Sequence, residues 1–375
     1  MESILLIGSA GSVGHDMLYL MASMGRPIKV IGADFDEGKG VYEIEESLQI
    51  AHNLGFYPDF SFRKADLFNI EQTAELLADV KPKVICSLAS LGSWWVTRLL
   101  PDDEYKKISP LGPWLPNHLT LSYKLMQAVK MSGLDTRVVN GAFPDATNVV
   151  LSKVGLAPTC GGGNMDIGIQ RFKRLIARDM GVPYRSVTIY GVGHHGTFYT
   201  RRYNGSFWVK IIVDGVDITE QYPNEKLRKM YEDAGYAASK QFTGPVVDQM
   251  KTAVSFLNNV LGIYYDTRKT HECIPGVEGL PGGYPARVSS EGVEVVLPPG
   301  LSREEAIEIN KEGGRIDGIE DIKDDGTVVF CDQNVEYMRE IFGYNCKELK
   351  LDESEERAKE LGERLKRLYE KYKVS

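Results

Sequence analysis

The chain has 375 residues, of which 43% are hydrophobic and 26% are charged, and its formal net charge is −8. This length is ample for a buried core and suggests two domains. The acidic balance argues against nucleic acid as the main partner, and the apolar runs are too short to span a bilayer. The five cysteines are widely scattered, which is typical of reduced thiols. We therefore expect a cytoplasmic protein that binds neither nucleic acid nor membrane.

Three glycines in a GxxGxxG pattern follow a predicted strand at residues 3–7 and open a predicted helix at 12–24. In a strand–turn–helix unit of this kind, Gly8 allows a sharp turn, Gly11 lets a pyrophosphate approach the backbone, and Gly14 lets the helix pack closely on the strand. The pattern therefore predicts a dinucleotide-binding site.

The start of this helix and the end of the next strand complete the predicted cofactor site. Backbone N–H groups of Ser12 and Val13 would face the phosphates, aided by the helix dipole. A second strand at 28–31 leads to Asp34, whose carboxylate would accept hydrogen bonds from the adenosine ribose and repel a 2′-phosphate. We therefore expect NAD rather than NADP, with Asp36 as the alternative acid if the strand ends later.

Strands and helices continue to alternate along the chain. Further strands are predicted at 60–63, 83–88 and 136–140, and further helices at 70–80 and 119–131. This alternation predicts an α/β fold with a doubly wound parallel Rossmann sheet, whose ligands sit at the carboxyl ends of the strands. Asp66, Ala89 and Asn140 follow three of these strands and are predicted to line the cofactor site, although Asp66 fits a helix cap equally well.

An ordered set of motifs begins at the fifth predicted strand. It comprises Asn-Gly-Ala-Phe-Pro-Asp at 140–145, Gly-Gly-Gly-Asn-Met-Asp at 161–166, Arg171, and Gly-Val-Gly-His-His-Gly at 191–196. In order and spacing, this set resembles the lactate/malate dehydrogenase superfamily, in which an α+β substrate domain follows the Rossmann domain. The resemblance implies an NAD-dependent oxidoreductase that transfers hydride to or from a secondary alcohol. The implied substrate is a 2-hydroxy acid or a related acidic or sugar-like compound.

The same resemblance implies roles for individual residues. His195 matches the catalytic acid/base, and Asp166 matches the acid that orients it. Asn140 would contact nicotinamide and substrate, and Arg171 would grip a substrate carboxylate. The chemistry suits these residue types, because histidine titrates near neutral pH, a buried carboxylate stabilises its protonated form, and an arginine fork matches a carboxylate. A surface turn, a helix cap and a solvated helix position are alternative interpretations of the histidine, the aspartate and the arginine.

The sequence departs from the family pattern at several positions. The segment that precedes Arg171 is longer than usual, so Ile169 competes for the place of the arginine. His194 stands where the family has glutamate, and we expect it to contact the substrate. Two further arginines, Arg98 after the fourth strand and Arg201 after the histidines, are candidates for binding a small anionic or polar substrate.

The remainder of the chain predicts a second domain. Helices are expected over 225–238, 244–261 and 352–372 and from Ser302 onward, and strands over 205–214, 286–288, 292–297 and 327–330. We place the boundary near residue 148, which gives an NAD-binding domain at 1–148 and an α+β catalytic domain at 149–375.

Two alternative functions remain open. NAD- and metal-dependent glycosidases of the same superfamily hold a divalent metal with a cysteine and a histidine, and here Cys160 could pair with His195 or His194. The Cys-His dipeptide of that family is absent, so we expect no metal. A non-catalytic NAD-binding sensor is the second alternative. The family resemblance also implies a homodimer or a homotetramer.

Overall fold

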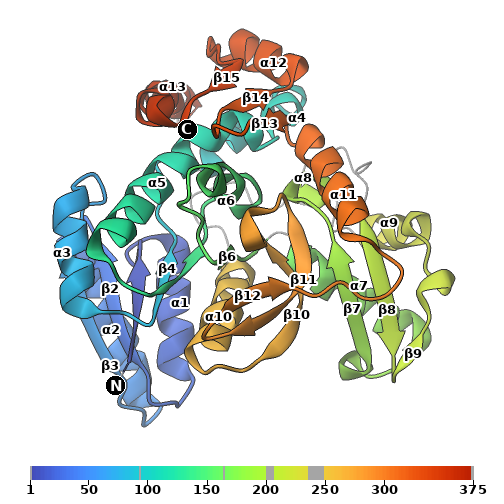
Figure 1. The fold of residues 1–375 in the computed structure, drawn as a ribbon, viewed down its shortest axis with the longest axis horizontal. Helices are drawn as coiled ribbons and strands as arrows, with labels where there is room; N and C mark the ends of the chain where they lie inside the picture. Colours follow the sequence, from blue (N-terminus) through green and yellow to red (C-terminus); the bar gives the residue numbers. More distant parts are fainter. Residues whose placement is uncertain (1, 93, 164, 200–206, 235–248, 373–375) are drawn as a thin grey trace.

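A computed structural model describes residues 2–92, 94–163, 165–199, 207–234 and 249–372 of the protein. Six parallel strands form its largest sheet in the order β3-β2-β1-β4-β5-β6 (Figure 1). These strands are β1 (Ser3–Ile7), β2 (Lys29–Asp34), β3 (Asp59–Lys64), β4 (Val84–Ser87), β5 (Arg137–Asn140) and β6 (Cys160–Gly161). The winding reverses between β1 and β4, and open α/β sheets bind ligands at such a switch point.

Side chains of β1 alternate between two apolar layers, one on each face of the sheet. Ile4 and Leu6 pack with α1 and α10, whereas Leu5 and Ile7 pack with α3 and α5. The helices of the first half are α1 (Ser12–Ser23), α2 (Glu37–Asn53), α3 (Ile70–Val80), α4 (Asp102–Ile108), α5 (Leu115–Ser132) and α6 (Pro144–Lys153). Burial on both faces explains why these strands are almost continuously apolar.

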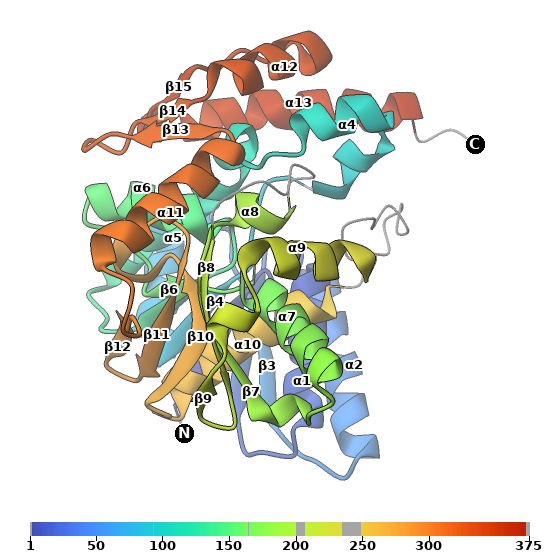
Figure 2. The same ribbon diagram turned by 90° about the vertical axis from the view of Figure 1, so that its right-hand side faces the viewer.

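The second half contains three small antiparallel sheets and the helices that pack on them (Figure 2). Their strands are β7 (Val187–Val192), β8 (Trp208–Val213), β9 (Val216–Asp217), β10 (Lys269–Pro275), β11 (Gly283–Ser289), β12 (Gly292–Val295), β13 (Ile319–Ile322), β14 (Val328–Phe330) and β15 (Glu348–Leu349). The helices are α7 (Met165–Met180), α8 (His195–Tyr199), α9 (Asn224–Asp233), α10 (Met250–Tyr264), α11 (Arg303–Ile316), α12 (Asp332–Phe342) and α13 (Ser354–Tyr372). A bridge between Gly193 and Gly283 links the first two of these sheets.

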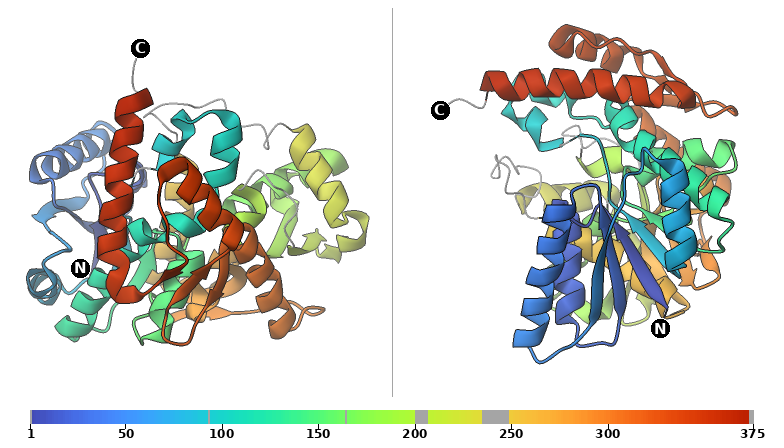
Figure 3. Two further views of the ribbon diagram at one scale, coloured as in Figure 1. Left: turned by 90° about the horizontal axis from the view of Figure 1, so that it is seen from above. Right: turned by 90° about the vertical axis from the view of Figure 1, so that its left-hand side faces the viewer.

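The C-terminal elements return to the first half of the chain. Helix α13 packs on α5, and α12 packs on α4, so that they form a separate layer in red above the parallel sheet (Figure 3). Leu361 and Leu365 of α13 belong to the same apolar core as Leu119 and Leu125 of α5. Within the described part of the chain, we find no helix that combines the length and apolar character needed to cross a bilayer.

The expected fold is confirmed, namely an α/β protein with a parallel Rossmann sheet followed by an α+β part. The expected capping box at Ser302 and Glu305 is also present at the start of α11. The expected boundary near residue 148 falls inside α6, and the sixth strand of the sheet lies after it. Parts of the elements expected over 205–214, 225–238 and 244–261 lie outside the described residues.

Candidate active site

The turn between β1 and α1 is shaped by glycine. Gly8 has φ +82°, and a Cβ there would lie 3.0 Å from the backbone nitrogen of Ala89, just after β4. A Cβ on Gly14 would lie 2.3 Å from the carbonyl oxygen of Gly8. Among the described residues, no side chain caps α1 at Gly11. The turn therefore presents bare backbone and the N–H groups of a helix start, a surface that fits a pyrophosphate.

Asp34 ends β2 beside this turn and is 8% exposed. Its Oδ2 accepts a hydrogen bond from the backbone of Ala10 at 3.1 Å, and its Oδ1 accepts one from the backbone of Asp36 at 3.2 Å. Asp36, the alternative acid, instead caps α2 through the backbone of Lys39. The carboxylate at the position expected for ribose recognition is therefore that of Asp34.

The other residues expected to line the cofactor site lie in different local environments. Ser12 and Val13 open α1 next to the turn, and Ala89 abuts Gly8. Asp66 is exposed, and its Oδ1 accepts a hydrogen bond from the backbone of Phe68 at 3.0 Å in an Asx-turn, so its part in the cofactor site stays a prediction.

The amide of Asn140 is engaged within the protein. Its Oδ1 accepts hydrogen bonds from the Ser122 hydroxyl and the Ala142 backbone, both at 3.1 Å. Its Nδ2 donates to Oδ1 of Asn148 at 2.9 Å, and Asn148 in turn donates to the carbonyl of Gly276. Asn140 is buried, so this network braces the end of β5 rather than presenting the amide to a ligand.

The two histidines lie where β7 gives way to α8. Nδ1 of His195 lies 2.7 Å from Oδ2 of Asp317, a fully buried carboxylate in the turn between α11 and β13. The backbone N–H of His195 donates to Oδ1 of Asp145 at 2.9 Å. Asp145 is in the first turn of α6, which follows β5. The imidazole is thereby tied to the carboxyl edge of the parallel sheet, the same edge that carries the glycine-rich turn.

Asp317 also anchors the segment that connects β4 with α5. Its Oδ1 accepts a hydrogen bond from the backbone of Leu111 at 2.7 Å, and its carbonyl accepts one from the backbone of Gly112 at 2.8 Å. Glycine is required at residue 112, because a Cβ would lie 2.6 Å from the Asp317 carbonyl oxygen. Both carboxylate oxygens of Asp317 are thus hydrogen-bonded, as a buried charge requires.

Burial and charge have opposite effects on the pKa values of His195 and Asp317. Burial lowers the pKa of His195, but the Asp317 charge and hydrogen bond outweigh it, and the pKa is raised above the usual 6.5. Burial raises the pKa of Asp317, but His195 outweighs it through its charge and hydrogen bond, and the pKa is lowered. The site therefore favours an imidazolium beside a carboxylate.

His194 is held as a neutral imidazole. It is 1% exposed, and its Nδ1 accepts a hydrogen bond from the backbone of Gly196 at 3.1 Å. Burial lowers its pKa, and the charges of Asp145 and Asp317 only partly offset this. The predicted substrate contact is therefore not favoured, because the ring is buried against Gly313 of α11.

Phe143 packs among three histidine rings at this site. It has φ +47°, in the left-handed region that is unusual for a bulky residue. Its ring centroid lies 5.7 Å from that of His195 and 6.1 Å from those of His194 and His118. The left-handed turn between β5 and α6 thus places an apolar ring next to the acid/base candidate.

Asp166 requires a correction, because the carboxylate on Nδ1 of His195 is that of Asp317. Asp166 lies in the first turn of α7 and hydrogen-bonds to the Ser255 hydroxyl and to Nε2 of Gln170. Burial raises the pKa of Asp166 to about 6, despite these hydrogen bonds. Helix α7 thus directs this acid toward α10, away from the pairing implied by the family resemblance.

Of the three arginines expected to bind the substrate, the structure describes two, and they lie in different elements. Arg171 donates to the hydroxyl of Tyr231 on α9 and lies over that ring, so its guanidinium is directed to α9. Ile169 is fully buried against Gly191 and belongs to the core of the second half. Arg98 lies in a short 3₁₀ helix over Trp94–Leu99, and Arg201 lies outside the described residues.

Cys160, which the metal-dependent alternative would use as a ligand, lies in the interior of the fold. Cys160 is fully buried in β6, and burial raises the pKa of its thiol to about 12. Among the described residues, no three histidine, cysteine, aspartate or glutamate side chains are grouped so that they could hold a metal ion.

Two residues that the sequence analysis did not single out are central to the site. Asp317 lies in an Ile-Asp-Gly turn whose residue pattern indicates only a helix end. Asp145 belongs to the motif at 140–145 but was assigned no role. Its position five residues after the end of β5 was the available signal, because ligand sites form where parallel strands end.

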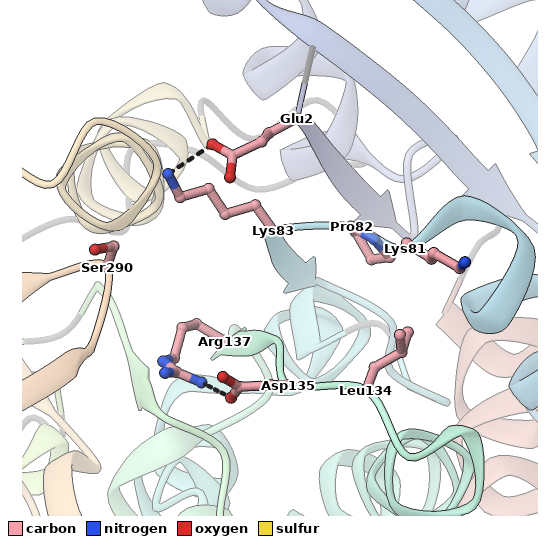
Figure 4. Close-up of a pocket in the computed structure, with 8 residues that line it drawn as sticks. All are labelled: Glu2, Lys81, Pro82, Lys83, Leu134, Asp135, Arg137 and Ser290. Carbon is pink, nitrogen blue, oxygen red and sulfur yellow. Dashed lines mark hydrogen bonds and ion pairs between the residues drawn. The ribbon is translucent and has the colours of Figure 1, made fainter.

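A polar cavity of about 260 Å³ lies at the opposite edge of the parallel sheet (Figure 4). Two of the cations that line it are in ion pairs, Lys83 with Glu2 and Arg137 with Asp135. Figure 4 shows the two side chains of each pair directed toward each other. Both pairs lie where strands of the parallel sheet begin, not where they end. This cavity is therefore separate from the site that contains His195.

Comparison with known proteins identifies the fold. No protein-family model matches the sequence, and no curated protein matches it. Solved structures do match. A malate dehydrogenase from Aeropyrum pernix is 17% identical with a TM-score of 0.58, covering 84% of this chain and 97% of that one. A lactate dehydrogenase from Eimeria maxima, solved with NADH and oxamate, is 16% identical with a TM-score of 0.60, covering 83% and 92%.

A third match, the malate dehydrogenase of Plasmodium falciparum in complex with NADH, is 18% identical with a TM-score of 0.55, covering 84% of this chain and 95% of that one. These comparisons show that the chain has the fold of the lactate and malate dehydrogenases. The chain spans nearly the whole length of these enzymes.

Proposed function

We propose that this chain is an NAD-dependent oxidoreductase that transfers hydride to or from a secondary alcohol on a small acidic or sugar-like substrate. The observation that carries the proposal is the hydrogen-bonded pair of His195 and Asp317 at the carboxyl edge of a Rossmann sheet. Solved dehydrogenases with this fold support it, including the one that holds NADH and oxamate.

His195 is proposed as the acid/base. Its Nδ1–H donates to Asp317, which leaves Nε2 to accept the proton of the substrate hydroxyl. Asp317 fixes this tautomer and stabilises the imidazolium without becoming protonated itself. Asp145 holds the backbone of His195 and so fixes where the ring stands. Bound NAD would supply the hydride acceptor.

The residues at the glycine-rich turn fit NAD. The bare backbone at Gly8 and Gly14 accommodates a pyrophosphate, because a Cβ at either position would meet neighbouring backbone. The carboxylate of Asp34 would accept hydrogen bonds from ribose hydroxyls and would repel a 2′-phosphate. We therefore propose NAD, rather than NADP, as the cofactor.

The test is NADH formation from NAD across a panel of 2-hydroxy acids and sugar acids. We compare the wild type with His195→Asn and with His52→Asn, an exposed histidine on α2 that serves as a matched control. Turnover of at least one compound is expected in the wild type and the control, with a loss of about 10²–10⁴-fold in His195→Asn.

Full turnover by His195→Asn would contradict the assignment of the acid/base. Binding of NADH without turnover of any compound would favour the non-catalytic sensor instead. The proposal includes a homodimer or homotetramer, which light scattering measures directly, and a monomer would contradict that part alone.

A further inference from the structure

His118 brings a third imidazole to the site, from an element that the proposed mechanism does not use. It lies in the first turn of α5, and its ring meets the ring of Phe143, whose other neighbours include His195. His195 and Asp317 both act electrostatically on His118, with opposite signs. The half-buried ring of His118 therefore lies near the proposed acid/base, with Phe143 as a neighbour of both imidazoles.

Nδ1 of His118 is buried and has no hydrogen-bond partner. Burial lowers the pKa of this imidazole to about 4, so it is neutral at physiological pH and offers one donor and one acceptor. A buried polar atom without a partner destabilises a folded protein, so each one calls for an explanation such as a functional role. A ligand that forms a hydrogen bond with this nitrogen would account for its lack of a partner within the protein.

The preceding residue has the same property. Asn117 is 2% exposed, and its Oδ1 is also buried without a partner. It packs on Gly92, in the segment that follows β4. An amide oxygen accepts hydrogen bonds only, and a neutral imidazole carries no charge to pair with a carboxylate. The start of α5 is therefore suited to a hydroxyl group.

We propose that His118 is a specificity-determining residue that hydrogen-bonds a second hydroxyl group of the substrate, next to the carbinol that His195 deprotonates. This inference rests on the proposed function and narrows it to substrates with neighbouring hydroxyl groups. Asn117 precedes His118 in the first turn of α5.

The experiment uses two pairs of compounds that differ by one hydroxyl group, lactate with glycerate and malate with tartrate, in both enantiomeric series. NADH formation gives kcat/KM for each compound with the wild type, His118→Phe and His118→Asn. In the wild type, we expect the compound with the extra hydroxyl to have a kcat/KM about tenfold higher in at least one pair. His118→Phe should reduce that ratio to about one, whereas His118→Asn, which keeps a hydrogen-bonding group, should retain part of it.

His271 provides the matched control. Burial also lowers its pKa to about 4, but its Nδ1 is paired with Oδ1 of Asn259 at 2.7 Å, between α10 and β10. His271→Phe should leave the substrate ratio unchanged and lower the melting temperature, because it leaves Oδ1 of Asn259 without this partner. His118→Phe should show the opposite pattern, with an unchanged or raised melting temperature.

An unchanged substrate ratio in His118→Phe overturns the role of His118 and leaves the proposed function intact. A melting temperature lowered as in His271→Phe, with the ratio preserved, identifies His118 as a purely structural residue and also overturns the inference. The absence of turnover by the wild type with every compound in both the pairs and the wider panel overturns the proposed function and this inference together.

Discussion

The imidazole of His195 and the carboxylate of Asp317 lie 2.7 Å apart, although 122 residues separate them in the chain. The other oxygen of Asp317 holds the backbone of Leu111, in the segment that leads into α5. One buried carboxylate therefore connects the candidate acid/base with the loop above the parallel sheet. Displacement of that loop would disturb the position of the carboxylate as well.

Replacing the partner of the imidazole should abolish most of the activity. In Asp317→Asn, the amide cannot stabilise the imidazolium, and we expect kcat to fall by about 10²–10⁴-fold. Asp166→Asn serves as the comparison, because Asp166 is hydrogen-bonded to Gln170 and Ser255 instead. Steady-state kinetics with the best panel substrate measure both. A larger loss in Asp166→Asn than in Asp317→Asn would restore the pairing implied by the family resemblance.

The pH dependence of alcohol oxidation should reflect the pKa of His195 beside Asp317. Oxidation needs neutral His195, and Asp317 raises the pKa of this imidazole above 6.5. The rate should therefore rise with pH through a midpoint above 6.5 in the wild type, and the midpoint should move to lower pH in Asp317→Asn. Profiles of kcat/KM against pH measure this shift. Identical midpoints in the two proteins would show that another group controls the profile.

Asp166 should affect stability in a pH-dependent way. Because burial raises its pKa from 3.8 to about 6 in the folded protein, the folded state binds the proton more tightly than the unfolded state. The wild type therefore loses stability as the pH rises between these values. Asp166→Asn lacks this loss, so its advantage should grow from near zero at pH 4 to about 1–3 kcal/mol at pH 7. Urea titrations at both pH values measure it, and a pH-independent difference would contradict the prediction.

Cofactor preference should depend on Asp34. Replacing the carboxylate in Asp34→Ser removes the repulsion of a 2′-phosphate and the acceptor for ribose hydroxyls. We expect the ratio of NADPH to NADH affinity to rise by about tenfold or more, as measured by nucleotide fluorescence. Asp36→Ser is the matched control, because Asp36 caps α2 through Lys39. Equal shifts in both variants would show that the effect comes from the local backbone.

The cofactor half of the fold was predictable because its signals are local. The glycine-rich turn and Asp34 lie within about thirty residues of one another, and strand–helix alternation determines the sheet. Asp317 was not predictable, because its turn carries no pattern and its role depends on how α11 packs on α8. The same is true of Asp166, whose direction is set by α10 rather than by its own helix.

Asp317 is synthesised well after the strands of the parallel sheet, which has a consequence for how the site is assembled. All six strands of the parallel sheet precede residue 162, whereas Asp317 follows much later in the chain, after α11. Domains begin to fold as they emerge. The nascent chain can therefore build its parallel sheet before the carboxylate that pairs with His195 has been synthesised, so the pair of His195 and Asp317 forms only after α11 has joined the fold.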